Sequence, residues 1–74
     1  MNRSVLKAAG EALWGPHYRS ELARACKVHL RTAMRWDRGE SPVPEEVLVV
    51  LTKLLLKRKE LIDKLVGKLT TSGE

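Results

Sequence analysis

The feature that most constrains the fold of this chain is residues 19–36, RSELARACKVHLRTAMRW. In its first half, small or apolar residues such as Leu22 and Cys26 recur at helical spacing on one face. In its second half, a projection at 3.6 residues per turn places Ala33 and Trp36 on one side. That side is expected to face a core. The opposite side carries Arg31, Met34, Arg35 and Arg38.

A short polar break separates the two halves. Val28 is the apolar residue within it, between Lys27 and His29. An apolar residue at this place is typical of the plug that holds two short helices at a steep angle. The pattern therefore predicts a helix-turn-helix, with one helix from residue 17 or 18 to 26 and a second from residue 29 or 30 to 38.

A further helical pattern precedes this pair, over residues 4–14. Ser4 is its expected N-cap, and Gly15-Pro16 is a sharp stop signal, because glycine can take the left-handed cap and proline cannot continue the helix. Trp14, at the helix end, is expected to be a core or lid residue. The apolar stripe of this helix is Val5, Leu6, Ala9, Ala12 and Leu13.

The C-terminal part of the chain favours a long helix. A rigid connector over residues 40–44, ESPVP, leads into a helix from about 44 to 69 that is either continuous or broken near 57–59. Residues 70–74 are a polar tail that we expect to be frayed and flexible. These elements predict an all-α fold, a small four- to five-helix domain with a helix-turn-helix and a long C-terminal helix.

The 74 residues suffice for one domain, 1–74. This is near the lower size at which a hydrophobic core stabilises a fold without disulfides or a metal. Its core is expected over about 3–56. A single cysteine, Cys26, allows no internal disulfide and falls on an apolar face, so we expect a buried small hydrophobe. No zinc spacing, signal peptide or membrane-length apolar run is recognised. We therefore expect a cytoplasmic protein with no metal, no cofactor and no membrane contact.

Positive charge is concentrated in two segments. The net charge is +5 and the isoelectric point about 9.8, which favours a polyanionic partner. Residues 17–38 hold six cationic and two acidic side chains, and residues 53–68 hold the same numbers, whereas residues 39–52 are acidic. The second segment could be only the solvated side of a helix. The first coincides with the helix-turn-helix and is the stronger indication of a nucleic-acid partner.

The spacing L-A-x4-V-x4-A-x2-W, with Val28, Ala33 and Trp36 at its last three defined positions, resembles the bihelical unit of the lambda-repressor-like (Cro or XRE) DNA-binding family. The resemblance covers roughly residues 3–56. It implies that residues 29–38 form the recognition helix in the major groove of double-stranded DNA.

Two positions depart from the family pattern. The family most often has glycine where Lys27 stands, because that residue ends the first helix in a left-handed conformation. It usually has a larger β-branched residue where Ala33 stands, so another side chain, Trp36 or Met34, is expected to close the packing of the two helices.

Arg31 and Arg35, one turn apart on the outward face, are the residues expected to read bases. The planar guanidinium can donate two hydrogen bonds to O6 and N7 of guanine. Leu30 and Met34 flank them and could touch a thymine methyl, although exposed apolar residues of an ordinary surface helix would look the same. His29, at the helix start, is expected either to contact DNA or to face solvent.

The resemblance also implies that the start of the first helix of the pair meets the DNA backbone. Free amide groups and the positive end of the helix dipole favour a phosphate there. His17, Arg19 and Ser20 would assist, with simple solvation as the alternative. Lys27 and Arg38 are further candidates for phosphate contacts, which set position without carrying sequence information.

The long C-terminal helix carries more apolar surface than a small core needs. Its later apolar stripe is Leu55, Ile62, Leu65 and Leu69, at steps of seven, three and four residues, and Arg58 occupies one position of this heptad-like stripe. The stripe is too short to form a stable helix alone. We expect residues 57–69 to extend a dimer interface, against the alternative that they pack back onto their own domain. The interface residues are Leu55, Ile62, Leu65, Val66 and Leu69.

The expected function is therefore sequence-specific DNA binding, as a homodimeric repressor or autoregulator of prokaryotic or phage type on a pseudo-palindromic operator in the nucleoid. We expect no separate lobe for a small-molecule ligand. The alternatives are a helical adaptor that binds another protein and a non-specific nucleic-acid binder. An enzyme is not expected, because His17 and His29 have no nucleophile or carboxylate cluster around them and no phosphate-binding loop is present.

Overall fold

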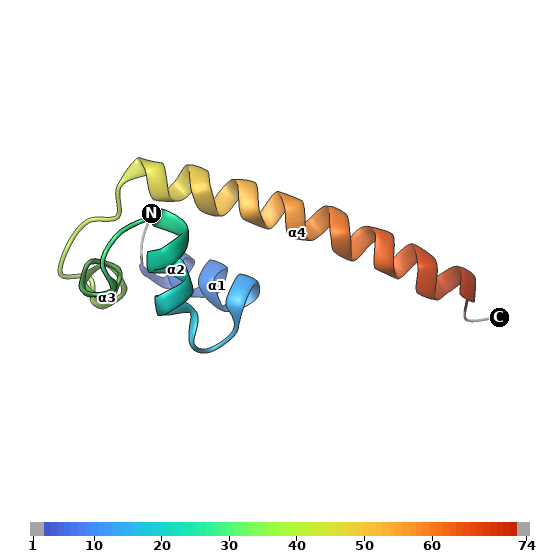
Figure 1. The fold of residues 1–74 in the computed structure, drawn as a ribbon, viewed down its shortest axis with the longest axis horizontal. Coiled ribbons are helices and arrows are strands. Elements are labelled where there is room, and N and C mark those ends of the chain that lie inside the picture. The colour runs from blue at the N-terminus through green and yellow to red at the C-terminus, as the bar shows by residue number, and fades with distance from the viewer. Residues whose placement is uncertain (1–2, 73–74) are drawn as a thin grey trace.

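The computed structural model describes residues 3–72, which form four α-helices and, within that range, no strand. Figure 1 shows three short helices gathered against the first half of a long fourth helix, whose second half extends past them. The expected all-α class, the boundaries of the helix-turn-helix and the long C-terminal helix are confirmed. The helices are α1 (Arg3–Trp14), α2 (Tyr18–Cys26), α3 (Leu30–Arg38) and α4 (Glu45–Ser72).

The core lies where α1, α2 and α3 meet the first two turns of α4. All four helices contribute to it, so burial of apolar area holds them together. Helices of nine residues, such as α2 and α3, are marginal alone in water, and their attachment to this core is what stabilises them. The buried apolar residues of the described chain are Leu6, Leu13, Tyr18, Leu22, Ala23, Ala33, Trp36, Val47 and Leu51.

A glycine lets α1 and α2 approach closely. Gly10 is buried, and a Cβ atom added there would overlap the ring of Tyr18. The phenol ring thus occupies the space that a side chain at position 10 would need. This contact sets how α2 lies against α1.

The expected stripe of α1 needs correction. Leu6 and Leu13 are buried as predicted, but Val5 and Ala12 are exposed, because the buried face runs through Gly10. Ser4 is not the N-cap, since α1 already includes Arg3 and Ser4 lies in its first turn.

The turn between α2 and α3 has the conformation that the family resemblance implied. Lys27 has φ 57° and ψ 44°, in the left-handed region, and is the one such non-glycine residue in the described chain. Its N–H donates to the carbonyl of Arg24, and the N–H of Val28 donates to the carbonyl of Ala23 at 3.0 Å. Val28 then packs against the core, as the plug of the turn was expected to do.

α4 is one continuous helix of 28 residues, about 42 Å long at 1.5 Å per residue. The possible break near 57–59 does not occur. Glu45 and Glu46 occupy the first turn, where negative charge suits the dipole. The helix also passes the expected end at 69: Thr70 and Thr71 are helical, and their hydroxyls donate to carbonyls four residues back. Residues 73 and 74 lie outside the described range.

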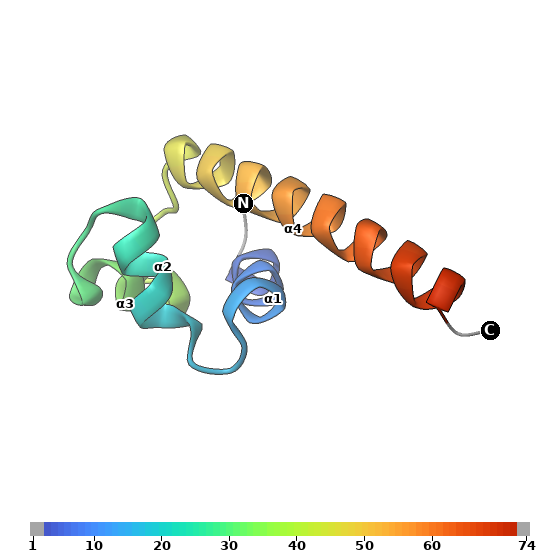
Figure 2. The ribbon, with the colours of Figure 1, turned by 45° about the vertical axis from the view of Figure 1, so that its right-hand side comes forward.

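The two ends of α4 have different surroundings. Val47 and Leu51 are buried, and Leu54 and Leu55 pack against the core. From Lys57 to Thr71 every residue is exposed, and Figures 1 and 2 both show this half of the helix beside no other helix. No helix within residues 3–72 has the length and apolarity needed to cross a bilayer.

Candidate nucleic-acid interface

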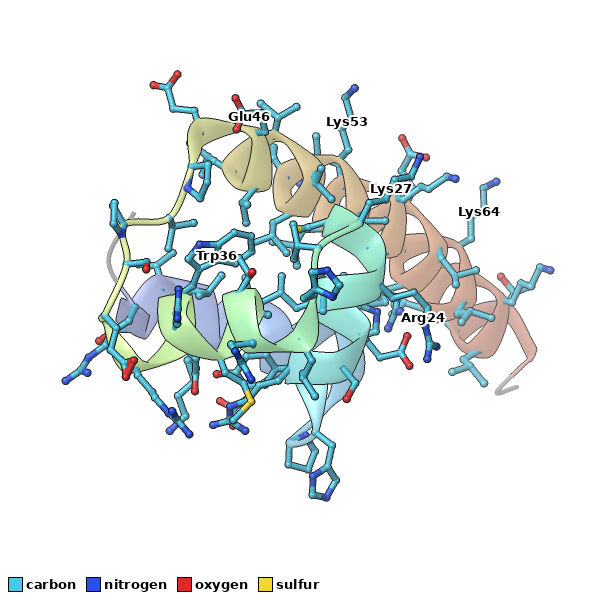
Figure 3. The ribbon with its side chains drawn as sticks, turned by 60° about the vertical axis from the view of Figure 1, so that its left-hand side comes forward. Arg24, Lys27, Trp36, Glu46, Lys53 and Lys64 are labelled. Atoms are coloured by element: carbon cyan, nitrogen blue, oxygen red, sulfur yellow. The ribbon has the colours of Figure 1, made fainter. Side chains whose placement is uncertain are left out.

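α3 has one face in the core and one in solvent. Ala33 is 0% exposed and Trp36 5% exposed, and Figure 3 shows the indole directed from α3 toward α4. Trp36 is therefore the residue that closes the packing above the small Ala33. On the opposite side, Arg31 and Arg35 are both exposed. The orientation of α3 predicted from its periodicity is confirmed.

The outward face of α3 forms a hollow of about 500 Å³. Leu30 and Met34 supply its apolar part, and three guanidinium groups surround it. Arg38 lies 4.0 Å from the carboxylate of Glu40, an exposed pair of little energetic weight. The hollow thus combines positive charge with two apolar side chains. Its lining is Leu30, Arg31, Met34, Arg35, Arg38 and Glu40.

The two ends of α3 are fixed by backbone contacts. His29 precedes the helix in extended conformation, exposed, without a side-chain capping hydrogen bond. At the other end Gly39 takes the left-handed conformation, φ 78°, and its N–H donates to the carbonyl of Trp36 at 3.1 Å. The guanidinium of Arg3 donates to the carbonyl of Arg38 at 2.7 Å, which attaches α1 to the end of α3.

A polar cluster ties the start of α2 to α3. The hydroxyl of Tyr18 donates to one oxygen of Asp37, and Nε of Arg19 donates to the other at 2.7 Å. The guanidinium of Arg19 also lies over the Tyr18 ring, 5.1 Å from its centre. The three side chains hold α2 and α3 in one relative orientation.

These contacts shift the pKa values of the cluster. Burial, followed by the hydrogen bond to Asp37, raises the pKa of Tyr18 to about 12. Burial would raise the pKa of Asp37, but the hydrogen bonds from Tyr18 and Arg19 outweigh it and leave that pKa below its ordinary value. The carboxylate is therefore charged and bonded at neutral pH.

The candidate phosphate residues are only partly brought together. His17 and Ser20 are exposed at the start of α2, and His17 precedes the helix without capping it by its side chain. The Nε of Arg19 is engaged by Asp37, although 42% of this side chain stays exposed. Figure 3 shows Lys27 at the end of α2 that faces α4, and Lys27 does not line the hollow of α3.

Asp37, Arg3 and Lys7 were not identified from the sequence. With Ser4 and Arg19 they line a second hollow of about 240 Å³. The contacts of Asp37 span 18 and 19 residues, so no local pattern marks them. The one sequence signal for the role of Asp37 was its acidic side chain in a helix otherwise rich in arginine.

The residues expected at a dimer interface fall into two groups. Ile62, Leu65, Val66 and Leu69 are exposed on the second half of α4. Leu55 instead is half-buried against the core of its own chain. Any interface with a second copy would therefore be centred past Leu55.

Cys26 is half-buried and packs against the core, and burial raises the pKa of its thiol. Within residues 3–72 no three side chains of the metal-binding types gather. No protein-family model, curated protein or solved structure matches this chain.

Proposed function

We propose that this protein is a sequence-specific double-stranded DNA-binding regulator that places α3 in the major groove. One observation carries the proposal: Trp36 and Ala33 anchor one side of α3 in the core, while Arg31 and Arg35 project from the other. A helix held in this way presents its guanidinium groups on one fixed face, as base reading requires.

The side chains around the hollow have the chemistry for a division of roles. Arg31 and Arg35 would donate to guanine O6 and N7, while Leu30 and Met34 would contact thymine methyl groups. Arg38, at the helix end beside Glu40, would contact phosphate. The net charge of +5 would draw the protein to any duplex before sequence is read.

The start of α2 is the proposed second contact with the backbone. His17 and Ser20 are exposed there, beside the free amide groups of the first turn. Arg19 would contribute its remaining N–H groups, because Asp37 engages only its Nε. The pairing with Asp37 would hold that guanidinium in place.

We further propose a homodimer that binds a pseudo-palindromic operator with half-site centres about 34 Å, or a multiple of that helical repeat, apart. The support is the exposed apolar surface on the second half of α4, including Ile62, Leu65 and Leu69. The resemblance to lambda-repressor-like proteins favours a repressor or autoregulator of prokaryotic or phage type, acting in the cytoplasm at the nucleoid. Its own concentration would then control occupancy, since two copies must meet on one site.

Selection of bound sequences from a random duplex pool, at one stated salt concentration, tests the proposal. The wild type should enrich one motif. Arg35→Ala should lose preference at part of that motif, because a guanine contact is removed. Lys53→Ala is the matched control: it removes the same charge from the side of α4 that Figure 3 shows facing away from α3. No enriched motif with the wild type would refute sequence-specific binding.

A helical adaptor that binds another protein is the second candidate. The same exposed residues of α4 favour it, because apolar surface of this kind suits any helical partner. The two candidates differ at α3. An adaptor should tolerate the loss of Arg31 and Arg35, whereas a DNA reader should not.

A further inference from the structure

An apolar groove lies where the end of α1 meets the middle of α4. Its volume is about 360 Å³, and Leu13, Trp14, Leu54, Lys57, Arg58 and Leu61 line it. Leu13 is buried and Trp14 half-buried, so the base of the groove is apolar. Lys57 and Arg58 are exposed, which places two positive charges at its edge.

The groove continues along α4 as an apolar face. Leu65 and Leu69 follow Leu61 at steps of four residues and so lie on the same side of the helix. They are 47% and 71% exposed. Figures 1 and 2 show that α1 ends before this part of α4 begins. Each chain therefore carries both a groove and a helical segment with the length and apolar character to fill one.

We propose that the groove receives the C-terminal part of α4 from a second copy, with the two α4 helices antiparallel. Each copy would insert Leu65 and Leu69 beside Trp14 of the other. This contact is self-complementary, as a two-fold dimer requires. The inference rests on the proposed homodimer and specifies its interface, but it does not depend on DNA binding.

Charge selects the antiparallel arrangement. The last turn of α4 has no basic residue, so its free carbonyl groups present the negative end of the helix dipole. Antiparallel packing brings this end of one helix to Lys57 and Arg58 of the other. Parallel packing would instead set Arg58 against Arg58 of the second copy across an apolar seam, and two like charges there would repel.

Helix length agrees with this register. The segment from Arg58 to Ser72 is about 22 Å long at 1.5 Å per residue. If the two-fold axis passes midway between Ile62 and Leu65, Leu69 of one copy lies opposite Arg58 of the other. The C-terminal turn then ends beside Trp14, where α1 ends.

A distance between spin labels distinguishes the arrangements. The label is placed at Leu48→Cys, an exposed position early in α4, in a Cys26→Ala background that removes the native thiol. Antiparallel packing predicts about 45 Å between the two labels, from 1.5 Å per residue along both helices. Parallel packing, with helix axes roughly 10 Å apart, predicts about 10 to 30 Å.

The second measurement is the dimer dissociation constant by sedimentation at low salt. Arg58→Glu reverses the charge that faces the helix end, and it should raise the dissociation constant about tenfold. Lys53→Glu makes the same charge change outside the groove and should change it by less than about threefold. Arg58 and Lys53 are both exposed, so circular dichroism should show both variants folded.

The outcomes separate this inference from the proposed function. A label distance near 45 Å with selective weakening by Arg58→Glu supports the inference. A label distance of about 10 to 30 Å, or equal effects of Arg58→Glu and Lys53→Glu, would overturn the antiparallel contact. The proposed dimer would not be affected by either result. A monomer in sedimentation overturns both the contact and the dimer, while recognition by α3 is still decided by the duplex selection.

Discussion

Lys27 shows most clearly how a single residue can depart from what its local structure favours. The turn needs a left-handed residue to end α2, and a lysine there carries the steric cost that glycine avoids. Other contacts must offset that cost. Val28, within the turn, packs against the core that contains Trp36, and these side chains are placed to do so.

Lys27→Gly should therefore stabilise the fold by roughly 1 kcal/mol, because it removes the left-handed strain. Urea denaturation followed by circular dichroism would measure the change. Lys53→Gly is the control: in the middle of a helix the same substitution should destabilise by about 1 kcal/mol. Equal losses at both positions would contradict the role of the turn conformation.

The Tyr18–Asp37 contact makes a prediction at the same scale. Tyr18 is the only tyrosine of the chain, so its phenolate absorbance can be followed directly. It should titrate near 12, and Asp37→Asn should lower its pKa without restoring the ordinary value, because burial remains. A wild-type titration near 10 would contradict this contact.

The shifted pKa values also predict how stability depends on pH. Folding raises the pKa of Tyr18 from 10.0, so this contribution is present below pH 10 and is lost as the pH rises toward about 12. Folding lowers the pKa of Asp37 from 3.8, so its contribution is present above that pH and is lost as the pH falls through the folded value. The denaturation midpoint should decrease in both of these pH ranges. The decrease should be smaller in Asp37→Asn than in the wild type.

At the scale of the elements, glycines in two helices have opposite roles. Gly10 of α1 lies against the Tyr18 ring, whereas a Cβ atom at Gly67 of α4 would have no neighbour within 4 Å. The same substitution should therefore have opposite effects in the two helices.

Gly10→Ala should destabilise by about 1 to 3 kcal/mol, since the added methyl group forces the ring to move. Gly67→Ala should leave stability unchanged or raise it by up to about 1 kcal/mol and increase helicity, because alanine favours an exposed helix. Thermal and urea denaturation of both variants would test the pair. A stable Gly10→Ala protein would show that α1 and α2 do not meet as described.

The helices were predictable where their signals are local. Helical periodicity and the break at Val28 predicted α2 and α3, and the spacing of Ala33 and Trp36 predicted which side is buried. Burial of Gly10 was missed because it depends on the Tyr18 ring of another helix. A continuous α4 was left open, since nothing in residues 57–59 either breaks or requires the helix.

The site was predictable to a similar extent. The outward position of Arg31 and Arg35 follows from the period of one helix. The engagement of Arg19 by Asp37 does not, because it joins residues 18 positions apart on different helices. Leu55 was placed in the dimer stripe by its spacing, but the same spacing suits the core that it contacts.

At the scale of the whole molecule, the protein is long and narrow, with extents of 51 × 21 × 20 Å. The projecting half of α4 accounts for this shape. Its residues from Lys57 to Thr71 are all exposed, so a partner would bury most of its apolar surface.

Leu65→Asp should therefore shift the protein to monomers in sedimentation, because it places a charge in the proposed interface. Lys64→Asp, on the neighbouring position and with the same new side chain, should leave the dimer. Persistence of dimers with Leu65→Asp would count against this half of α4 as the interface. Both variants should retain the helical core, whose buried residues end at Leu51.

The central claim is that the outward arginines of α3 read bases while their neighbours contact phosphate. It is tested most directly by measuring affinity for the selected duplex and for each of its single-base variants, over a range of salt. Arg31→Ala should lose about 1 to 3 kcal/mol and its preference at one position. Arg38→Ala should weaken all duplexes equally and reduce the salt slope by about one. An unchanged base preference with Arg31→Ala would contradict the claim.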